Sequence, residues 1–257
     1  MSKIGKYELH AFGKSKSPDA VLCSDIDLGG EEWTPIGKNY SSAFKGSFDG
    51  QGHTVSGLSI TGSASSNTGL FGYVDSATIE NVTVQGSISL TGNGSSSYGA
   101  GGIAGSSSSA MSGCANYGNI AVTETAAGGI TSASSGTITD CTNHGSVSST
   151  QQSGGVVGAL NGTVSNCVNY GTITGDFFIG GISSRIYTGG EINGCYNYGS
   201  VDARNMAGGG TGYNDEGTID NCHNRKDVTA NIMVAGIAGY NKGTITNCTS
   251  TGKITSL

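Results

Sequence analysis

The fold is decided by a stretch that the chain repeats, Gly136-Thr137-Ile138-Thr139-Asp140-Cys141-Thr142-Asn143-His144-Gly145-Ser146-Val147. The pattern returns as Gly162-Thr163-Val164-Ser165-Asn166-Cys167-Val168-Asn169-Tyr170-Gly171-Thr172-Ile173. Six of the seven cysteines share one position in it, at intervals of 27, 26, 28, 27 and 26 residues: Cys114, Cys141, Cys167, Cys195, Cys222 and Cys248. Self-similarity at a nearly fixed period is the sequence signature of a solenoid.

A second block of glycines and apolar residues precedes each cysteine block, as at 102–105, 129–130, 155–158, 181–182 and 236–239. The coil near Gly208 is looser, because Gly210 stands where the others have an apolar residue. Upstream, Leu58 and Val82 occupy the cysteine position. We therefore predict an all-β fold, a parallel β-solenoid (β-helix) of about eight coils of roughly 27 residues, with three short strands per coil.

Side-chain parity predicts which residues face the core. The position six residues after each cysteine is always β-branched and lies on the same face as the cysteine: Ile120, Val147, Ile173, Val201, Val228 and Ile254. The apolar position three residues before it has the opposite parity, so the chain must turn in between. Gly, Asn or Asp directly precedes each cysteine position, and these residues tolerate left-handed backbone. We expect a corner there.

The composition argues against several classes of fold and function. Forty-six glycines, 7% aromatic and 12% charged residues argue against a helical or α/β enzyme core. The 12 basic and 18 acidic residues give a net charge of -6 without a basic stripe, which argues against nucleic acid as a partner. No apolar run is long enough for a membrane span, and residues 1–14 lack the hydrophobic core of a signal peptide.

The six stacked cysteines have two interpretations. They are either functional, as disulfides or a metal-thiolate site, or structural, as a column of small, buried, reduced thiols. We favour reduced thiols, since Cβ atoms one strand apart, about 4.8 Å, exceed the usual disulfide separation of about 3.8 Å. A line of thiolates does not offer zinc its tetrahedron, and no CxxC pair occurs. Cys23 lies outside the column. We predict no metal and no cofactor.

Two further columns follow each cysteine. An inward asparagine stands two residues on: Asn116, Asn143, Asn169, Asn197 and Asn224. We expect these amides to bond to one another in a structural ladder. The next, outward position carries Tyr117, His144, Tyr170, Tyr198 and Arg225. Its rings either cover one another or form a binding face, for which the candidates are Tyr117, His144, Tyr170 and Tyr198.

The N-terminal segment reads differently. Residues 1–50 hold bulky residues suited to capping an open solenoid end: Trp33, Pro18, Pro35, Phe12, Phe44 and Phe48. We predict a capping segment with the first coil at 1–50 and solenoid repeats at 51–257. Asp25 and Asp27 raise calcium as an alternative, although strand alternation alone explains two outward carboxylates.

Four segments carry a family resemblance: Asp25-Ile26-Asp27-Leu28, Trp33-Thr34-Pro35-Ile36-Gly37, residues 44–55 and Gly69-Leu70-Phe71-Gly72. They resemble the GLUG-motif repeats of bacterial surface and adhesin-like proteins, also found in the non-catalytic N-terminal part of IgA-specific metallopeptidases. The resemblance is most specific at 25–86 and continues weakly to the end. It implies a right-handed solenoid displayed outside the cell and offers no catalytic residues. The short leader between Tyr7 and Val21 and the missing export signal suggest an excised fragment. The end at 254–257 has no obvious cap, which suggests that more repeats or another domain follow in the parent protein.

The leading functional hypothesis is a non-catalytic structural or adhesive module, a stalk or interaction surface of a secreted or cell-surface bacterial protein. The enzymatic alternative is a polysaccharide lyase or glycosidase, by analogy of fold. Such chemistry needs paired carboxylates, and we find none at matching positions of adjacent coils.

Ice binding is a remote alternative. Thr137, Thr163, Thr218 and Thr244 share a position, but Met111 and Glu191 interrupt the array. We expect a host or bacterial surface protein or glycan as partner, no nucleic acid, no membrane insertion, and end-to-end self-association through exposed strand edges.

Overall fold

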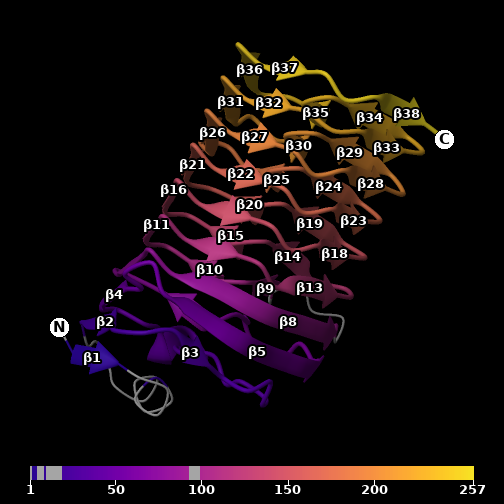
Figure 1. Cartoon of the computed structure of the whole chain (residues 1–257). Helices are drawn as coiled ribbons and strands as arrows, with labels where there is room; N and C mark the ends of the chain where they lie inside the picture. The colour runs from indigo at the N-terminus through magenta and orange to yellow at the C-terminus, as the bar shows by residue number, and fades with distance from the viewer. Residues whose placement is uncertain (1, 5–8, 10–18, 93–98) are drawn as a thin grey trace.

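The protein is an elongated stack of coils, which the computed structural model describes at residues 2–4, 9, 19–92 and 99–257. Figure 1 shows successive coils lying on one another from the N- to the C-terminal end. The coils form about nine turns of about 27 residues in a right-handed, all-β parallel solenoid, which confirms the predicted fold class. In the described residues every paired strand runs parallel to its neighbour one coil away, as β16 does to β21.

Four sheets, here named A to D, form the walls. Sheet A contains β1 (Ser2–Ile4), β2 (Ala20–Leu22), β4 (Ser47–Asp49), β7 (Thr78–Glu80), β11 (Ala110–Ser112), β16 (Thr137–Thr139), β21 (Thr163–Ser165), β26 (Glu191–Asn193), β31 (Thr218–Asp220) and β36 (Thr244–Thr246). Sheet C contains β6 (Phe71–Val74), β10 (Ala104–Ser107), β15 (Thr131–Ser134), β20 (Val157–Leu160), β25 (Ser183–Ile186), β30 (Thr211–Asn214) and β35 (Ala238–Asn241).

The other two walls complete each coil. Sheet B contains β3 (Ile26–Asp27), β5 (Thr54–Ser63), β8 (Thr83–Thr91), β12 (Ala115–Asn116), β13 (Asn119–Val122), β17 (Thr142–Asn143), β18 (Val147–Ser149), β22 (Val168–Asn169), β23 (Ile173–Gly175), β27 (Tyr196–Asn197), β28 (Val201–Ala203), β32 (His223–Asn224), β33 (Val228–Ala230), β37 (Thr249–Ser250) and β38 (Ile254–Ser256). Sheet D contains β9 (Gly99–Gly101), β14 (Ala126–Gly128), β19 (Gln152–Gly154), β24 (Phe178–Gly180), β29 (Met206–Gly208) and β34 (Met233–Ala235). A short 3-10 helix, η1, spans Tyr40–Ser42.

A regular coil is divided more finely than the three expected strands. The coil from β15 to β19 has five short strands, because turns divide two of the three sequence blocks. One turn follows the ladder asparagine, as where Gly118 N donates to Asn116 Oδ1 and Asn116 Nδ2 donates to Gly118 O. These bonds satisfy backbone groups that a continuous strand would pair with its neighbour.

The predicted corner is confirmed at all eight positions. The residue before each cysteine position has a positive φ, between 49° and 70°: Gly57, Asn81, Gly113, Asp140, Asn166, Gly194, Asn221 and Asn247. Left-handed backbone reverses the inward parity between sheets A and B, so that apolar residues on both sides of the corner enter one core. Ile138 and Cys141, for example, are both fully buried.

Register corrects one detail of the threonine array. Met111 pairs with Ile138 in sheet A and is buried, so it belongs to the core column. Ala110, which pairs with Thr78, holds the outward position before it. Glu191 pairs with Thr163 and does interrupt the array.

The N-terminal residues continue the same core. Phe44 and Phe48 both pack on Phe71, with ring centroids 5.1 and 5.2 Å apart. Trp33 Nε1 donates to Leu70 O at 3.1 Å. Phe12 and Pro18 lie outside the described residues, and the division at residue 50 stays a prediction. Within the described part of the chain, no helix is long and apolar enough to cross a bilayer.

Candidate functional site

The outward column forms a continuous aromatic stack, defined here as Tyr117, His144, Tyr170 and Tyr198. The centroid distances along it are 4.1, 4.7 and 5.4 Å, and the planes of neighbouring rings differ by 4°, 14° and 10°. The three tyrosines are 40–50% exposed. The outward aromatic column expected from the sequence is therefore present at the surface.

Stacking limits what this surface offers a ligand. Each inner ring has neighbours over both faces, so mainly ring edges and phenol hydroxyls point to solvent. Desolvation between Tyr117 and Tyr170 lowers the pKa of His144, which favours its neutral form. The stack thus offers a row of uncharged polar edges at strand spacing.

Beneath the stack runs the asparagine ladder, and both come from the same turn. The Nδ2 atom of each asparagine donates at 2.8 Å to Oδ1 of the next, from Asn116 through Asn143, Asn169 and Asn197 to Asn224. Asn224 continues it to Ser250 Oγ at 3.1 Å. Five successive asparagines are almost completely buried. This agrees with the structural role expected for them.

The cysteine column lies at the adjoining corner. All seven cysteines are unpaired, and five of the column are buried while Cys248 is half-buried. Each column thiol faces the carbonyl two residues earlier, as in Cys141 Sγ to Thr139 O at 3.3 Å. Hydrogen bonding to a neighbouring cysteine, together with burial, raises the pKa of Cys114 and of Cys167. The same hydrogen bonds between neighbouring thiols lower the pKa of Cys141 and of Cys195, whereas burial disfavours the charged thiolate at all four positions.

Asp25 and Asp27, the two carboxylates considered as calcium ligands, accept hydrogen bonds from nearby backbone N–H groups. Asp25 Oδ1 accepts from Thr54 N at 2.9 Å and lies 3.1 Å from His53 Nδ1. Asp27 Oδ1 accepts from Gly29 N at 2.8 Å. Among the described residues no three His, Cys, Asp or Glu side chains group as metal ligands.

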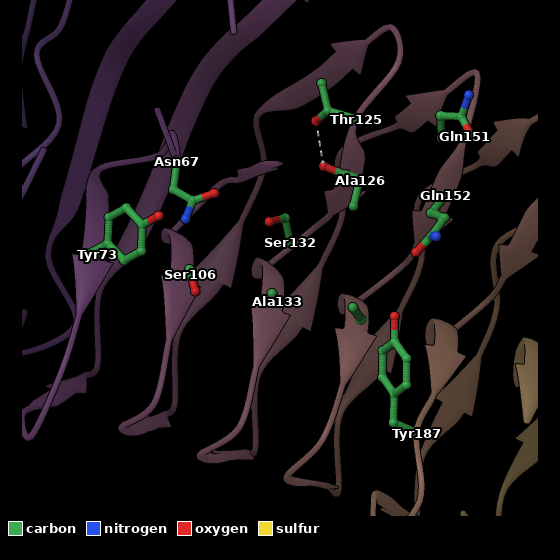
Figure 2. A pocket seen from close by; sticks show the side chains of 11 residues that line it. Asn67, Tyr73, Ser106, Thr125, Ala126, Ser132, Ala133, Gln151, Gln152 and Tyr187 are labelled. Atoms are coloured by element: carbon green, nitrogen blue, oxygen red, sulfur yellow. Dashed lines mark hydrogen bonds between the residues drawn. The ribbon is translucent and has the colours of Figure 1, made fainter. Parts of the chain in front are cut away.

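Sequence reasoning missed a groove on the outer surface of sheet C and the adjoining corner of sheet D. Its volume is about 310 Å³, and its lining comprises Asn67, Tyr73, Ser106, Thr125, Ala126, Ser132, Ala133, Gln151, Gln152, Ala159 and Tyr187. Figure 2 shows Tyr73 and Tyr187 on opposite sides, with Ser106 and Ala133 on strands between them. The sequence signal that could have revealed this groove is the outward column of sheet C. It carries a large side chain at Tyr73, small ones at Ser106, Ala133 and Ala159, and large ones again from Arg185 onward.

The repeated coil has counterparts among known proteins. The family model described as "The GLUG motif" matches residues 230–255, which include β34 to β37 and most of β38. The chain carries a GLUG motif. The resemblance to GLUG repeats is thereby confirmed, although the matched segment is the last coil and not the 25–86 region whose motifs suggested it.

The chain also resembles two solved structures. A putative immunoglobulin A1 protease from Bacteroides ovatus superposes with a TM-score of 0.72 at 18% identity, covering 97% of this chain and 84% of the other. A second structure, described as IgA1 Protease, gives 0.64 at 14% identity, covering 97% of this chain and 21% of that one. At these identities the likeness concerns the fold alone.

One curated protein shares sequence with part of this chain. Halomucin of Haloquadratum walsbyi is 52% identical over 52 residues. That match covers 20% of this chain and 1% of halomucin. The chain therefore spans a very small part of this relative's length.

Proposed function

We propose that the chain is a non-catalytic structural and adhesive module of a secreted or cell-surface bacterial protein, acting as a stalk and as a surface for a protein or glycan. The observation that carries the proposal is the continuous exposed aromatic stack from Tyr117 to Tyr198 on a rigid, ladder-supported wall. Rigid aromatic side chains provide contact area at low entropic cost, which suits them to interfaces.

The arrangement of carboxylates supports a non-catalytic role over glycoside cleavage. Asp215 accepts from Arg185 Nη2 at 2.8 Å, and this bond lowers the pKa of Asp215. Asp220 accepts from Thr246 Oγ1 and Asn247 Nδ2, which lowers its pKa. A general acid for glycoside hydrolysis needs a raised pKa instead. Polysaccharide cleavage remains the second candidate, by analogy with other parallel β-helices.

A binding screen against glycans and surface proteins tests the proposal, with product-release assays on polysaccharides run beside it. We expect specific binding of a surface protein that is lost when Tyr117, Tyr170 and Tyr198 are replaced together by alanine. Phe177→Ala, which removes another exposed ring outside the stack, is the matched control. Reproducible product release would overturn the non-catalytic assignment, and binding unchanged by the triple variant would eliminate the stack as the contact surface.

A further inference from the structure

We infer that the groove on sheet C binds an uncharged oligosaccharide. This inference deepens the proposed function and rests on it, but it places the glycan contact away from the aromatic stack. The groove is floored by the outward residues of three successive strands, Ser106 on β10, Ala133 on β15 and Ala159 on β20. Because these side chains are small, the sheet is hollowed where neighbouring coils carry large ones.

The ends of the groove are aromatic. Tyr73 on β6, which pairs with Ser106, lies at one end, and Tyr187, which directly follows β25, lies at the other. Arg185 on β25 pairs with Ala159. The strands β6 and β25 are four strand spacings apart, or about 19 Å. That length accommodates several linked rings, whereas a monosaccharide or an ion would leave most of it unfilled.

The C-terminal end is a prearranged wall. The Arg185 guanidinium carbon lies 4.3 Å from the Tyr187 ring centroid and 5.0 Å from that of Tyr213. Asp215 fixes the guanidinium at 2.8 Å, and Tyr240 stacks on Tyr213 with centroids 4.7 Å apart. Tyr187, held beside Arg185, lines the groove, and Figure 2 shows this ring across from Tyr73. Ring faces of this kind pack against the apolar C–H face of a sugar.

The polar groups of the lining suit hydroxyl ligands. Gln151 and Gln152 contribute side-chain amides, which present both donors and acceptors. Asn67, Thr125 and Ser132 are buried and each already bonds to backbone: Asn67 Oδ1 accepts from Gly99 N, and the two hydroxyls donate to Ala126 O and Gly105 O. No side chain in this lining carries a formal charge. Polar groups placed beside aromatic rings fix the orientation of a small-molecule ligand. The chemistry favours a neutral saccharide over an acidic one.

A second hollow of about 230 Å³ extends the groove toward the corner between sheets C and A. It shares Tyr73, Ser106 and Ala133 with the first and adds Tyr40 and Asn161. It also adds the carboxylate of Asp75, which pairs with Lys45 Nζ at 3.2 Å. The Tyr40 ring meets Tyr73 edge to face, with centroids 6.4 Å apart. Tyrosine therefore lines both hollows, which extends the surface available to a chain of sugars.

A bound peptide strand fits this surface less well. Peptides commonly add to an exposed sheet edge through backbone hydrogen bonds. The floor strands β10, β15 and β20 each already pair on both sides. Recognition here must rely on side chains, as it does for saccharides.

The test is calorimetric titration of the full chain with maltohexaose, cellohexaose, mannohexaose, xylohexaose and chitohexaose, with hexagalacturonate as the acidic comparator. We expect at least one neutral hexasaccharide to bind and hexagalacturonate to bind less tightly. Ala133→Tyr refills the floor with the side chain that the same column carries at Tyr213 and Tyr240. It should weaken binding about tenfold or more, as should Tyr187→Ala.

The matched control is Ala110→Tyr, which adds the same ring to an exposed position of sheet A. Circular dichroism melting establishes that each variant is folded. Neutral-sugar binding that survives Ala133→Tyr but is lost with the Tyr117, Tyr170 and Tyr198 triple variant would overturn the groove and support the stack. The reverse pattern would support the groove. Failure of every neutral hexasaccharide to bind would overturn the groove alone, because binding of a protein would still support the proposed module.

Discussion

Asn143 donates a hydrogen bond from Nδ2 to Oδ1 of Asn169 at 2.8 Å, and both side chains are fully buried in adjacent coils. Asn169 in turn donates to Asn197 and exchanges two bonds with the backbone of Gly171. One amide therefore connects three coils and closes its own turn.

Replacing Asn169 by alanine should destabilise the protein by about 2–4 kcal/mol, because buried partners on Asn143, Asn197 and Gly171 lose their hydrogen bonds. Urea unfolding followed by circular dichroism measures the loss. Asn161→Ala is the control, since that side chain is exposed. Equal stability of the two variants would show that the ladder contributes little.

The left-handed corner makes a separate prediction at Asn166, whose φ is 53°. Asn166→Val should cost about 1–2 kcal/mol, because a β-branched side chain disfavours this conformation. Asn166→Gly removes the steric cost and should change stability much less. Thermal melting of the pair measures the difference, and a glycine variant as unstable as the valine variant would contradict the backbone explanation.

The cysteines should respond to folding and to pH. In the folded, unreduced protein only exposed Cys23 should react rapidly with a thiol reagent, whereas all seven should react after unfolding. Desolvation raises the pKa of half-buried Cys248, and Asp220 acts in the same direction. Labelling of Cys248 should therefore require a higher pH in the folded than in the unfolded chain.

The same shift affects stability. A thiol whose pKa is raised by folding contributes stability below the unfolded pKa of about 8.5 and loses it as pH rises further. We expect the unfolding midpoint to fall in alkaline solution. In the thiol-labelling experiment, the contrary outcome is a single reactive thiol in the unfolded, unreduced chain, which would mean that the other six cysteines form disulfides.

His144 should titrate below its ordinary range, because desolvation in the stack lowers its pKa. Its contribution to stability is present above the unfolded pKa of about 6.5 and decreases as pH falls. Nuclear magnetic resonance of the imidazole protons measures the pKa directly. His144→Tyr keeps a ring at this position and should abolish this part of the pH dependence. An unshifted His144 pKa would contradict a desolvated stack.

End-to-end association is a further prediction for a polypeptide of this sequence. In the described residues β36, β37 and β38 each pair with one earlier strand, and Ile254 is 40% exposed. Light scattering should show a mass that increases with concentration, and Ile254→Lys should suppress the increase, with Ile254→Val as control. A concentration-independent monomer would exclude association.

The sequence by itself determined the solenoid, its period, the left-handed corners and the columns of cysteine, asparagine and aromatic residues. These features repeat at fixed intervals, and stacking turns a sequence interval into a spatial neighbour. Ile138, Cys141 and Asn143 could therefore be assigned to the core without coordinates.

Only the tertiary structure decided how the coil bends and where its surface is hollow. Five strands replaced three. One of the two additional divisions is the turn at Asn116 and its equivalents, which depends on side-chain bonds to backbone that no periodicity reveals. The groove depends on Tyr73, Ala133 and Tyr187, which lie in different coils and are recognised together only once register is known. The walls of the groove are formed by Tyr73 and Tyr187. The direction in which these side chains point is set by packing and, at Tyr187, by the charge of Arg185.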